Sequence, residues 1–195
     1  MTTTDYPARL SIEYPDRPLD RVSTLLRILY VIPIAIVASL LSAHAGWAGI
    51  LFAPVLVMIL FRRKYPRWWF DFNLQLTRFA TRVGAYMALM SDAYPSTDEE
   101  QYVHLELDYP DAGRELNRWL PLVKWILAIP HIVILVFLSI GALLAGIGAW
   151  FAILFTGRYP RGIFDYIEGV MRWWLRVEAY AILLITDEYP PFQLS

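Results

Sequence analysis

The chain has 195 residues, a formal net charge of -1, no cysteine and 57% apolar residues, so its mean hydropathy is positive. This composition argues against an ordinary water-soluble domain and is typical of a membrane protein. The near-neutral charge argues against nucleic-acid binding, which needs an excess of Lys and Arg. The lack of cysteine excludes disulfides and thiolate chemistry.

A short strand is predicted near the start of the chain. Residues 9–14 alternate polar and apolar side chains, which is the period of a strand with one covered face. Pro15 and Asp16 follow directly and favour a turn, because proline cannot donate a hydrogen bond to a neighbouring strand. We expect the strand to end there.

A long apolar stretch follows from Leu25 to Phe61, and only Ser42–Gly46 interrupts it. This pattern predicts a hairpin of two transmembrane spans, at roughly 19–41 and 47–63. The second span would be only about 24 Å long at about 1.5 Å per residue, against a hydrocarbon core of about 30 Å. A short or re-entrant hairpin is therefore the alternative.

An amphipathic helix is predicted from about residue 67 to 90. It follows Pro66, which suits a helix start because its missing N–H group leaves nothing to satisfy. Asp71, Arg78 and Arg82 fall on one face of this helix and form a polar stripe. Aromatic side chains surround the stripe, which is typical of a helix lying at a membrane surface.

The same unit then occurs a second time. An offset of 94 residues aligns Leu60–Ser91 with Leu154–Ile185 and makes thirteen of thirty-two positions identical. This identifies an internal repeat, so the fold must be interpreted as two copies of one unit. The copies span residues 9–95 and 102–192.

The second copy repeats each predicted element. Residues 102–109 alternate strictly and should pair with the first strand in a small sheet. Trp119–Phe155 should form the second hairpin, with its turn near three glycines in residues 141–148. A second amphipathic helix should begin at Pro160. Its polar stripe consists of Asp165, Arg172 and Arg176.

Basic residues flank both predicted hairpins, whereas the two predicted turns carry none. By the positive-inside rule, both termini and both amphipathic helices are expected in the cytoplasm. The predicted fold class is a mainly α, multi-pass protein of the cytoplasmic (inner) membrane. It has two tandem transmembrane hairpins, each preceded by a short strand and followed by a cytoplasmic interfacial helix.

Seven Tyr-Pro pairs mark the ends of the predicted elements. Proline fixes each boundary, and tyrosine has an apolar body with a polar tip. We therefore expect these tyrosines to lie at the membrane–water interface. The pairs begin at residues 6, 14, 65, 94, 109, 159 and 189.

The two polar stripes have two interpretations. Their arginines could bind anionic lipid headgroups, with about 1 kcal/mol from each basic residue at the surface. They could instead pair with Asp71 and Asp165, or with Glu13 and Glu106 on the strands. The structural pairing is favoured, because Asp recurs with the arginines in both copies. The candidate residues for lipid or partner binding are Asp71, Arg78, Arg82, Asp165, Arg172 and Arg176.

Two prolines interrupt the first span of each predicted hairpin at corresponding positions, Pro33 and Pro130. Proline removes a backbone hydrogen bond and kinks a helix, and paired breaks in two halves can indicate a transport site. His131 adds a titratable group beside the second break. Helix packing is the simpler explanation, because almost no charge lies deep in the predicted spans.

The segments Arg118–His131 and Arg158–Phe192 resemble a bacterial membrane-protein family catalogued as the domain of unknown function numbered 4389. The resemblance covers nearly the whole chain as two copies. The first copy departs from it, with Ile34 at the position of His131. The resemblance implies a small integral membrane protein and transfers no catalytic residue.

No catalytic motif is present, and the three histidines lack metal-ligand spacing. We therefore expect no enzyme activity, no metal and no cofactor. The predicted function is a membrane scaffold or accessory subunit that presents a charged cytoplasmic face to a protein partner or anionic lipid. The alternative is a small homo-oligomeric channel or transporter, with Pro33, Pro130 and His131 along its path.

Overall fold

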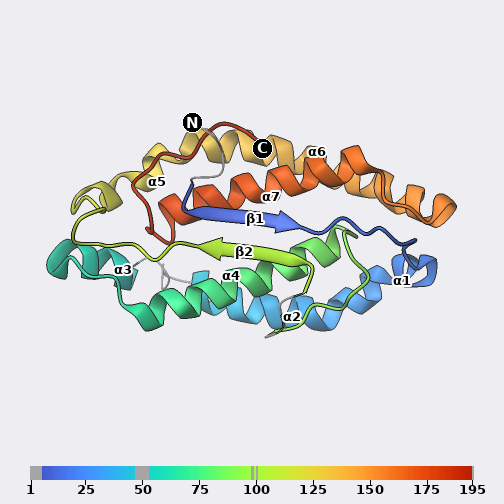
Figure 1. Cartoon of the computed structure of the whole chain (residues 1–195), viewed down its shortest axis with the longest axis horizontal. Coiled ribbons are helices and arrows are strands. Elements are labelled where there is room, and N and C mark those ends of the chain that lie inside the picture. Colours follow the sequence, from blue (N-terminus) through green and yellow to red (C-terminus); the bar gives the residue numbers. More distant parts are fainter. Residues whose placement is uncertain (1–5, 47–52, 98, 100, 195) are drawn as a thin grey trace.

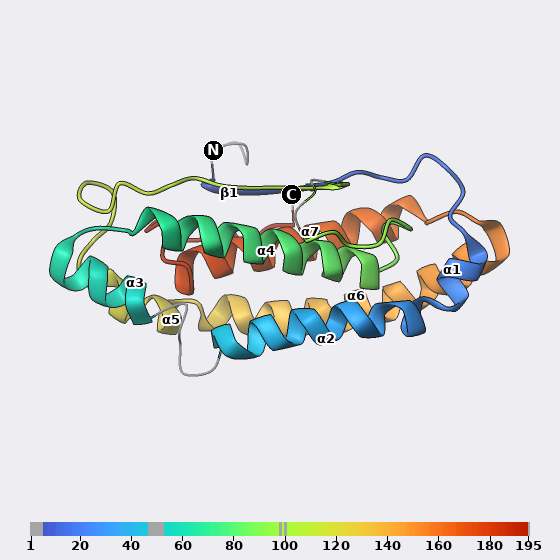
Figure 2. The ribbon, with the colours of Figure 1, turned by 90° about the horizontal axis from the view of Figure 1, so that it is seen from below.

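The computed structural model describes residues 6–46, 53–97, 99 and 101–194. Most of the described chain is helical, as predicted, and a two-stranded sheet completes it. The elements stack in three layers (Figures 1 and 2). The strands are β1 (Ala8–Ile12) and β2 (Val103–Leu107), and the long amphipathic helices are α4 (Arg67–Met87) and α7 (Arg161–Ala181). The other helices are α1 (Arg21–Leu25), α2 (Arg27–Gly46), α3 (Ala53–Val57), η3 (Met58–Arg62), η4 (Leu120–Leu122), α5 (Lys124–Leu127) and α6 (Ile129–Thr156).

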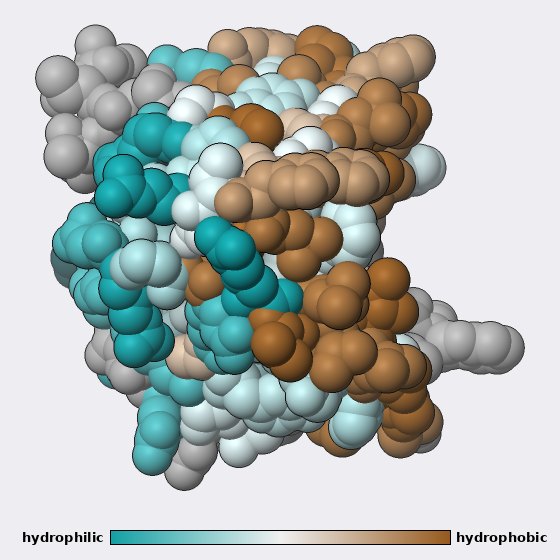
Figure 3. Space-filling model, turned by 90° about the vertical axis from the view of Figure 1, so that its right-hand side faces the viewer, coloured by the Kyte–Doolittle hydropathy of each residue, from teal (hydrophilic) through white to brown (hydrophobic). Residues whose placement is uncertain are grey.

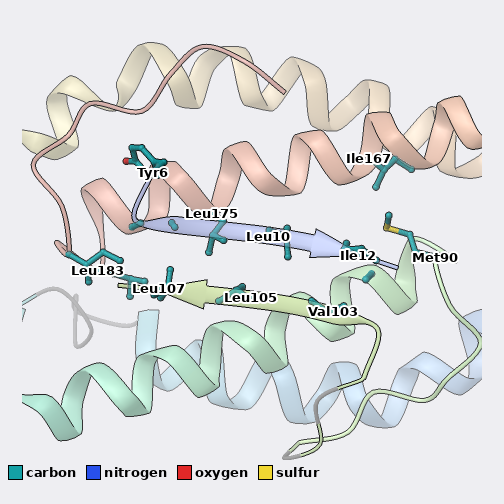
Figure 4. Packing of buried hydrophobic residues seen from close by; sticks show 14 of the residues in the cluster. Tyr6, Leu10, Ile12, Met90, Val103, Leu105, Leu107, Ile167, Leu175 and Leu183 are labelled. Atoms are coloured by element: carbon teal, nitrogen blue, oxygen red, sulfur yellow. The ribbon is translucent and has the colours of Figure 1, made fainter. Parts of the chain in front are cut away.

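The sheet forms the first layer and confirms the predicted strand pair. β1 and β2 run antiparallel, with Leu10 opposite Leu105. Alternate side chains of both strands are buried beneath the sheet, because the side-chain period of a strand is two. Figure 4 shows Leu10 and Leu105 among the core residues between the sheet and the helices, together with Leu175 of α7.

The middle layer consists of the two predicted amphipathic helices. α4 and α7 begin directly after Pro66 and Pro160, which cap them with extended backbone. Proline is tolerated there because the first N–H groups of a helix have no partner within the helix. The helix starts were therefore predicted correctly.

The two copies exchange their strands. β1 belongs to the first copy but packs on α7 of the second, whereas β2 belongs to the second copy and packs on α4 of the first (Figure 1). Buried residues from both copies form one core cluster. The sequence repeats are therefore interlocked in space.

The predicted second hairpin is not formed, because residues 129–156 make a single helix, α6. The glycines in its middle are helical rather than turn-forming. A Cβ atom at Gly141 would lie 2.6 Å from the hydroxyl of Tyr166 on α7, and that hydroxyl donates to Leu138 O at 2.8 Å. Gly141 therefore permits close packing of α7 on α6, and a helical glycine costs only about 1 kcal/mol.

The first predicted hairpin also differs from the structure. Ser42–Gly46, the expected turn, belongs to α2, and residues 47–52 lie outside the described part. The short helices α3 and η3 lie beyond the end of α2 and not beside it (Figures 1 and 2). α2 and α6 thus lie in the third layer, roughly parallel to the sheet.

Candidate membrane-binding face

Two arginines of the predicted stripes, Arg78 and Arg172, bind the strands. Arg78 Nε donates to Leu105 O at 2.9 Å, and Arg172 Nε donates to Leu10 O at 2.9 Å. Each bond joins a helix of one copy to the strand of the other. The acceptors lie on the outer edges of the sheet, so the arginines also occupy groups that could otherwise pair with another strand.

The other two stripe arginines, Arg82 and Arg176, are each only 3% exposed. Arg82 donates to Thr97 O at 3.3 Å and to Glu99 O. The guanidinium of Arg176 lies 6.0 Å from the ring centroid of Tyr6. Burial lowers the pKa of Arg176, and the charge of Arg172 acts in the same direction. Neither guanidinium is presented to a lipid headgroup.

The stripe aspartates do not meet these arginines. Asp71 pairs with Arg67 at 3.9 Å and Asp165 pairs with Arg161 at 3.1 Å, each one helical turn away, and all four side chains are more than half exposed. The structure therefore assigns the Asp residues to local surface pairs. The expected pairing of the arginines with Asp71 and Asp165 is wrong, although the arginines do join helices to strands.

The strand residues Glu13 and Glu106, which were the other expected partners of the stripe arginines, also bind other side chains. Glu13 Oε1 lies 2.9 Å from His104 Nε2, and Glu106 Oε2 lies 3.3 Å from Arg9 Nε. Arg9 also binds Asp108 at 2.7 Å. These exposed charges of both signs make up the outer face of the sheet.

Two buried ion pairs that the sequence analysis missed hold the outer helices to the segments after α4 and α7. Arg27 Nη2 lies 2.8 Å from Asp92 Oδ1, and its guanidinium lies over the ring of Tyr86 at 4.0 Å. In the second copy, Lys124 Nζ lies 2.6 Å from Asp187 Oδ1 and 5.1 Å from the ring centroid of Tyr180. We call each of these sets a clasp.

Lys124 is fully buried, and burial lowers its pKa while its bond to Asp187 raises it. A sequence signal for both clasps existed. Ser91-Asp92 and Thr186-Asp187 occupy equivalent places before a Tyr-Pro pair, and a cation stands six residues before each of Pro33 and Pro130. The signal combines residues about 65 positions apart, so helical spacing alone could not find it.

Tyrosines of the Tyr-Pro pairs also connect the copies. Tyr65 donates to Leu183 O at 2.8 Å, and Tyr159 donates to Ala88 O at 3.0 Å. Both tyrosines are buried, so the prediction that they lie at the membrane–water interface is wrong for this pair. Each fixes the start of one amphipathic helix against the end of the other.

The three transport candidates lie on two different helices. Pro33 lies within α2, whereas Pro130 is the second residue of α6 and so helps to begin that helix. His131 is fully buried, and its Nδ1 accepts a hydrogen bond from Trp173 Nε1 at 3.1 Å. Its ring stacks on Phe192 with 3.9 Å between centroids.

The surface of α2 and α6 away from α4 and α7 is apolar and exposed. Figure 3 shows hydrophobic residues gathered along one side of the molecule and hydrophilic residues on the opposite side. Large apolar side chains that are half or more exposed are Ile28, Leu29, Ile36 and Leu40 on α2, and Val133, Phe137, Ile140, Leu143, Leu144, Ile147, Phe151 and Phe155 on α6. We call this surface the apolar face. Contiguous exposed patches of this kind mark interaction surfaces.

Basic and aromatic side chains border the apolar face at its two ends. Arg17, Arg21 and Arg158 are exposed where α1 meets the end of α6. Large exposed tryptophans at the opposite end are Trp68, Trp119 and Trp125. This combination is typical of protein surfaces at the level of lipid headgroups.

Among the described residues, α6 is the one helix long and apolar enough to cross a membrane, judged by length and composition. Only 11% of its most apolar 18-residue window is buried, so it is not a core helix. No group of three His, Asp or Glu side chains in the described ranges could hold a metal ion.

Comparison with known proteins gives one family. The family model described as "Domain of unknown function (DUF4389)" matches residues 21–97 and again residues 118–193. The two matches support the two tandem copies found in the sequence, and each match begins after the strand of its copy. No curated protein and no solved structure matches the chain.

Proposed function

Because the chain belongs to the DUF4389 family, whose description names no activity, we propose its function from geometry: a membrane-anchored scaffold or accessory subunit. The apolar face would lie in one leaflet of the cytoplasmic membrane. The outer face of the sheet would remain in water and bind a protein partner.

The exposure of α6 is the observation that carries this proposal. At about 25 cal/mol per Å² of apolar surface removed from water, the eight exposed α6 side chains of the apolar face provide a large driving force for entering hydrocarbon. The basic and tryptophan residues at both ends support lipid as the covering medium, because such residues anchor proteins at headgroup level.

The layers favour an in-plane position over a spanning one. α7 packs along α6 and carries charged residues, and the sheet covers α7. If α6 crossed the bilayer, these charges would be carried into the hydrocarbon, at about 2.5–3.5 kcal/mol for each charged residue at the centre. We therefore propose a monotopic arrangement in place of the multi-pass arrangement expected from hydropathy.

The sheet face supports a protein partner more than an anionic lipid. Arg9, His104, Glu13, Glu106 and Asp108 form ion pairs there, so the face carries both signs and little net positive charge. An anionic surface would be attracted by an excess of basic residues. Both ends of the described part of the chain lie on the side of the sheet (Figure 2), and we propose that this side faces the cytoplasm.

Vesicle flotation tests the anchoring. The purified protein should float with phosphatidylcholine–phosphatidylglycerol vesicles. The double variant Phe137→Asp with Leu144→Asp should lose flotation by at least tenfold, since two charges would enter hydrocarbon. The matched control Ser11→Asp, on the exposed sheet face, should float like the unchanged chain. Equal flotation of the double variant would contradict the proposal.

A further inference from the structure

A groove runs between the start of α2 and the C-terminal half of α6, with the end of α4 as its floor. Its volume is about 650 Å³, within the range of about 300–1,000 Å³ in which proteins bind small ligands. Its walls include Ile28 of α2, and Leu143, Gly146 and Phe151 of α6. Ala88 belongs to its floor.

The chemistry of the walls excludes a polar ligand. The single charged residue of the groove is Arg27, and its guanidinium is already bound by Asp92 and by Ser91 O at 2.9 Å and covered by Tyr86. The remaining lining residues are apolar side chains or glycine. A bound molecule would therefore gain from hydrophobic burial and dispersion, with no hydrogen bond to orient it.

The groove is open to the apolar face. Its rim residues Ile28 and Leu143 are 75% and 67% exposed, and both belong to that face. A ligand could thus enter from hydrocarbon without crossing water. A groove left empty inside a bilayer would lose the contacts of its lining atoms.

A basic group lies at one end of the groove. Trp150, which lines it, donates to Thr24 O of α1 at 3.1 Å. Arg21, one turn earlier on α1, is exposed and donates to Phe155 O, one turn beyond Phe151. A headgroup phosphate near Arg21 would place an attached acyl chain beside the groove.

We propose that this groove binds one acyl chain of a membrane phospholipid whose anionic headgroup lies at Arg21. This deepens the proposed function and rests on it, because the chain reaches the groove only if the apolar face lies in the membrane. The protein would then bind one phospholipid molecule in the groove, in addition to the non-specific contacts of the apolar face with the surrounding lipids.

Photocrosslinking locates the chain. Phosphatidylglycerol with a diazirine midway along one acyl chain is placed in phosphatidylcholine vesicles with the protein, and the crosslinked peptides are identified by mass spectrometry. If the acyl chain lies in the groove, we expect the crosslinks to be concentrated at residues 84–89 and 142–151. Crosslinks spread evenly over the apolar face would overturn the proposal.

Two glycines provide a matched pair of variants. A Cβ atom at Gly146, in the groove, or at Gly162, at the start of α7, meets no atom within 4 Å. Gly146→Leu should therefore extend a side chain into the groove and reduce groove crosslinking several-fold, while Gly162→Leu should leave it unchanged. Arg21→Gln should reduce the preference for phosphatidylglycerol over a phosphatidylcholine probe.

The two proposals fail in different ways. If the protein floats with vesicles but Gly146→Leu crosslinks like the unchanged chain, the groove proposal falls and the anchoring stands. If the protein does not float at all, both fall. The crosslink map of the unchanged chain decides the location even if a variant folds poorly.

Discussion

The two copies use the same clasp with different cations. In the first copy, Arg27 contacts Asp92, the carbonyl of Ser91 and the face of Tyr86. In the second, Lys124 is a compact charge that contacts Asp187 and Thr186 O, with Tyr180 at 5.1 Å. In both copies a buried cation therefore joins the apolar layer to the segment after the amphipathic helix. Lysine depends more on its carboxylate, because it cannot spread its charge over a planar group.

The copies also differ at the positions around the clasps. Gly84 lines the groove in the first copy, whereas the equivalent position of the second copy is Glu178. Ile34 similarly corresponds to His131, which is buried against Trp173 and Phe192. The first copy is therefore apolar and open at this point, and the second is polar. The groove itself is shared, because α2 and α4 of the first copy and α6 of the second line it.

Breaking the second clasp should have the largest effect. Asp187→Ala leaves the fully buried Lys124 without its carboxylate, which should lower the free energy of unfolding by about 3–5 kcal/mol. Asp92→Ala should cost less, because Arg27 keeps its stacking on Tyr86. Reversible urea unfolding in mild detergent measures both.

A double variant is the control for the clasp. Lys124→Met with Asp187→Leu removes the whole buried pair and should recover most of the lost stability, because replacing both partners leaves no unpaired charge. Equal costs for Asp187→Ala and Asp92→Ala would contradict the proposed difference between lysine and arginine.

The pH dependence of stability should reveal the titration of the buried Glu178 carboxyl. Burial raises the pKa of its carboxyl from 4.5 to about 7. Between these values the folded state binds more protons than the unfolded state, so the free energy of unfolding falls as pH rises through this window and stays low above about 7. Glu178→Gln should therefore be more stable than the unchanged chain at pH 8, on the order of 2 kcal/mol, and equally stable near pH 4. A parallel pH profile for the two proteins would show that Glu178 is not responsible.

The tyrosines that join the copies should contribute equally. Tyr65→Phe and Tyr159→Phe each remove one hydrogen bond to a backbone carbonyl of the other copy. Each should cost about 1 kcal/mol, measured by the same urea unfolding. If only one of the two variants lost stability, the two hydrogen bonds would not contribute equally to holding the copies together.

The exposed stripe aspartates should matter least. Asp71→Ala and Asp165→Ala break surface pairs one helical turn apart, and such pairs contribute less than about 0.5 kcal/mol. Unfolding in low and high salt checks this. A loss above 2 kcal/mol in either variant would restore the view that the acidic stripe residues lock the fold.

Local patterns predicted the strands and the two amphipathic helices. Alternation at residues 9–14 and 102–109 depends only on which face is covered, and Pro66 and Pro160 restrict the backbone directly. The prediction of two transmembrane hairpins failed because hydropathy indicates only that a segment avoids water. It does not indicate whether that segment forms one helix or two, or how the helix is oriented relative to the membrane. The glycine at 141 signals close packing with Tyr166 rather than a turn.

The contacts of the arginines could not be predicted from one helix. Their acceptors, Leu105 O for Arg78 and Leu10 O for Arg172, depend on the exchange of strands between copies. That exchange is a property of the tertiary fold. The apolar face follows from composition, but its separation from the charged sheet appears only when all three layers are assembled.

The depth of α6 in the bilayer tests the central claim most directly. The chain has no cysteine, so a spin label can be attached at Val133, Leu144 or Phe155 after a single substitution. These three exposed positions lie three turns apart on one side of α6 and together cover about 33 Å, roughly the hydrocarbon thickness. The in-plane arrangement predicts the same depth for all three labels within one leaflet. A central label at Leu144 with labels at Val133 and Phe155 at opposite membrane surfaces would contradict it.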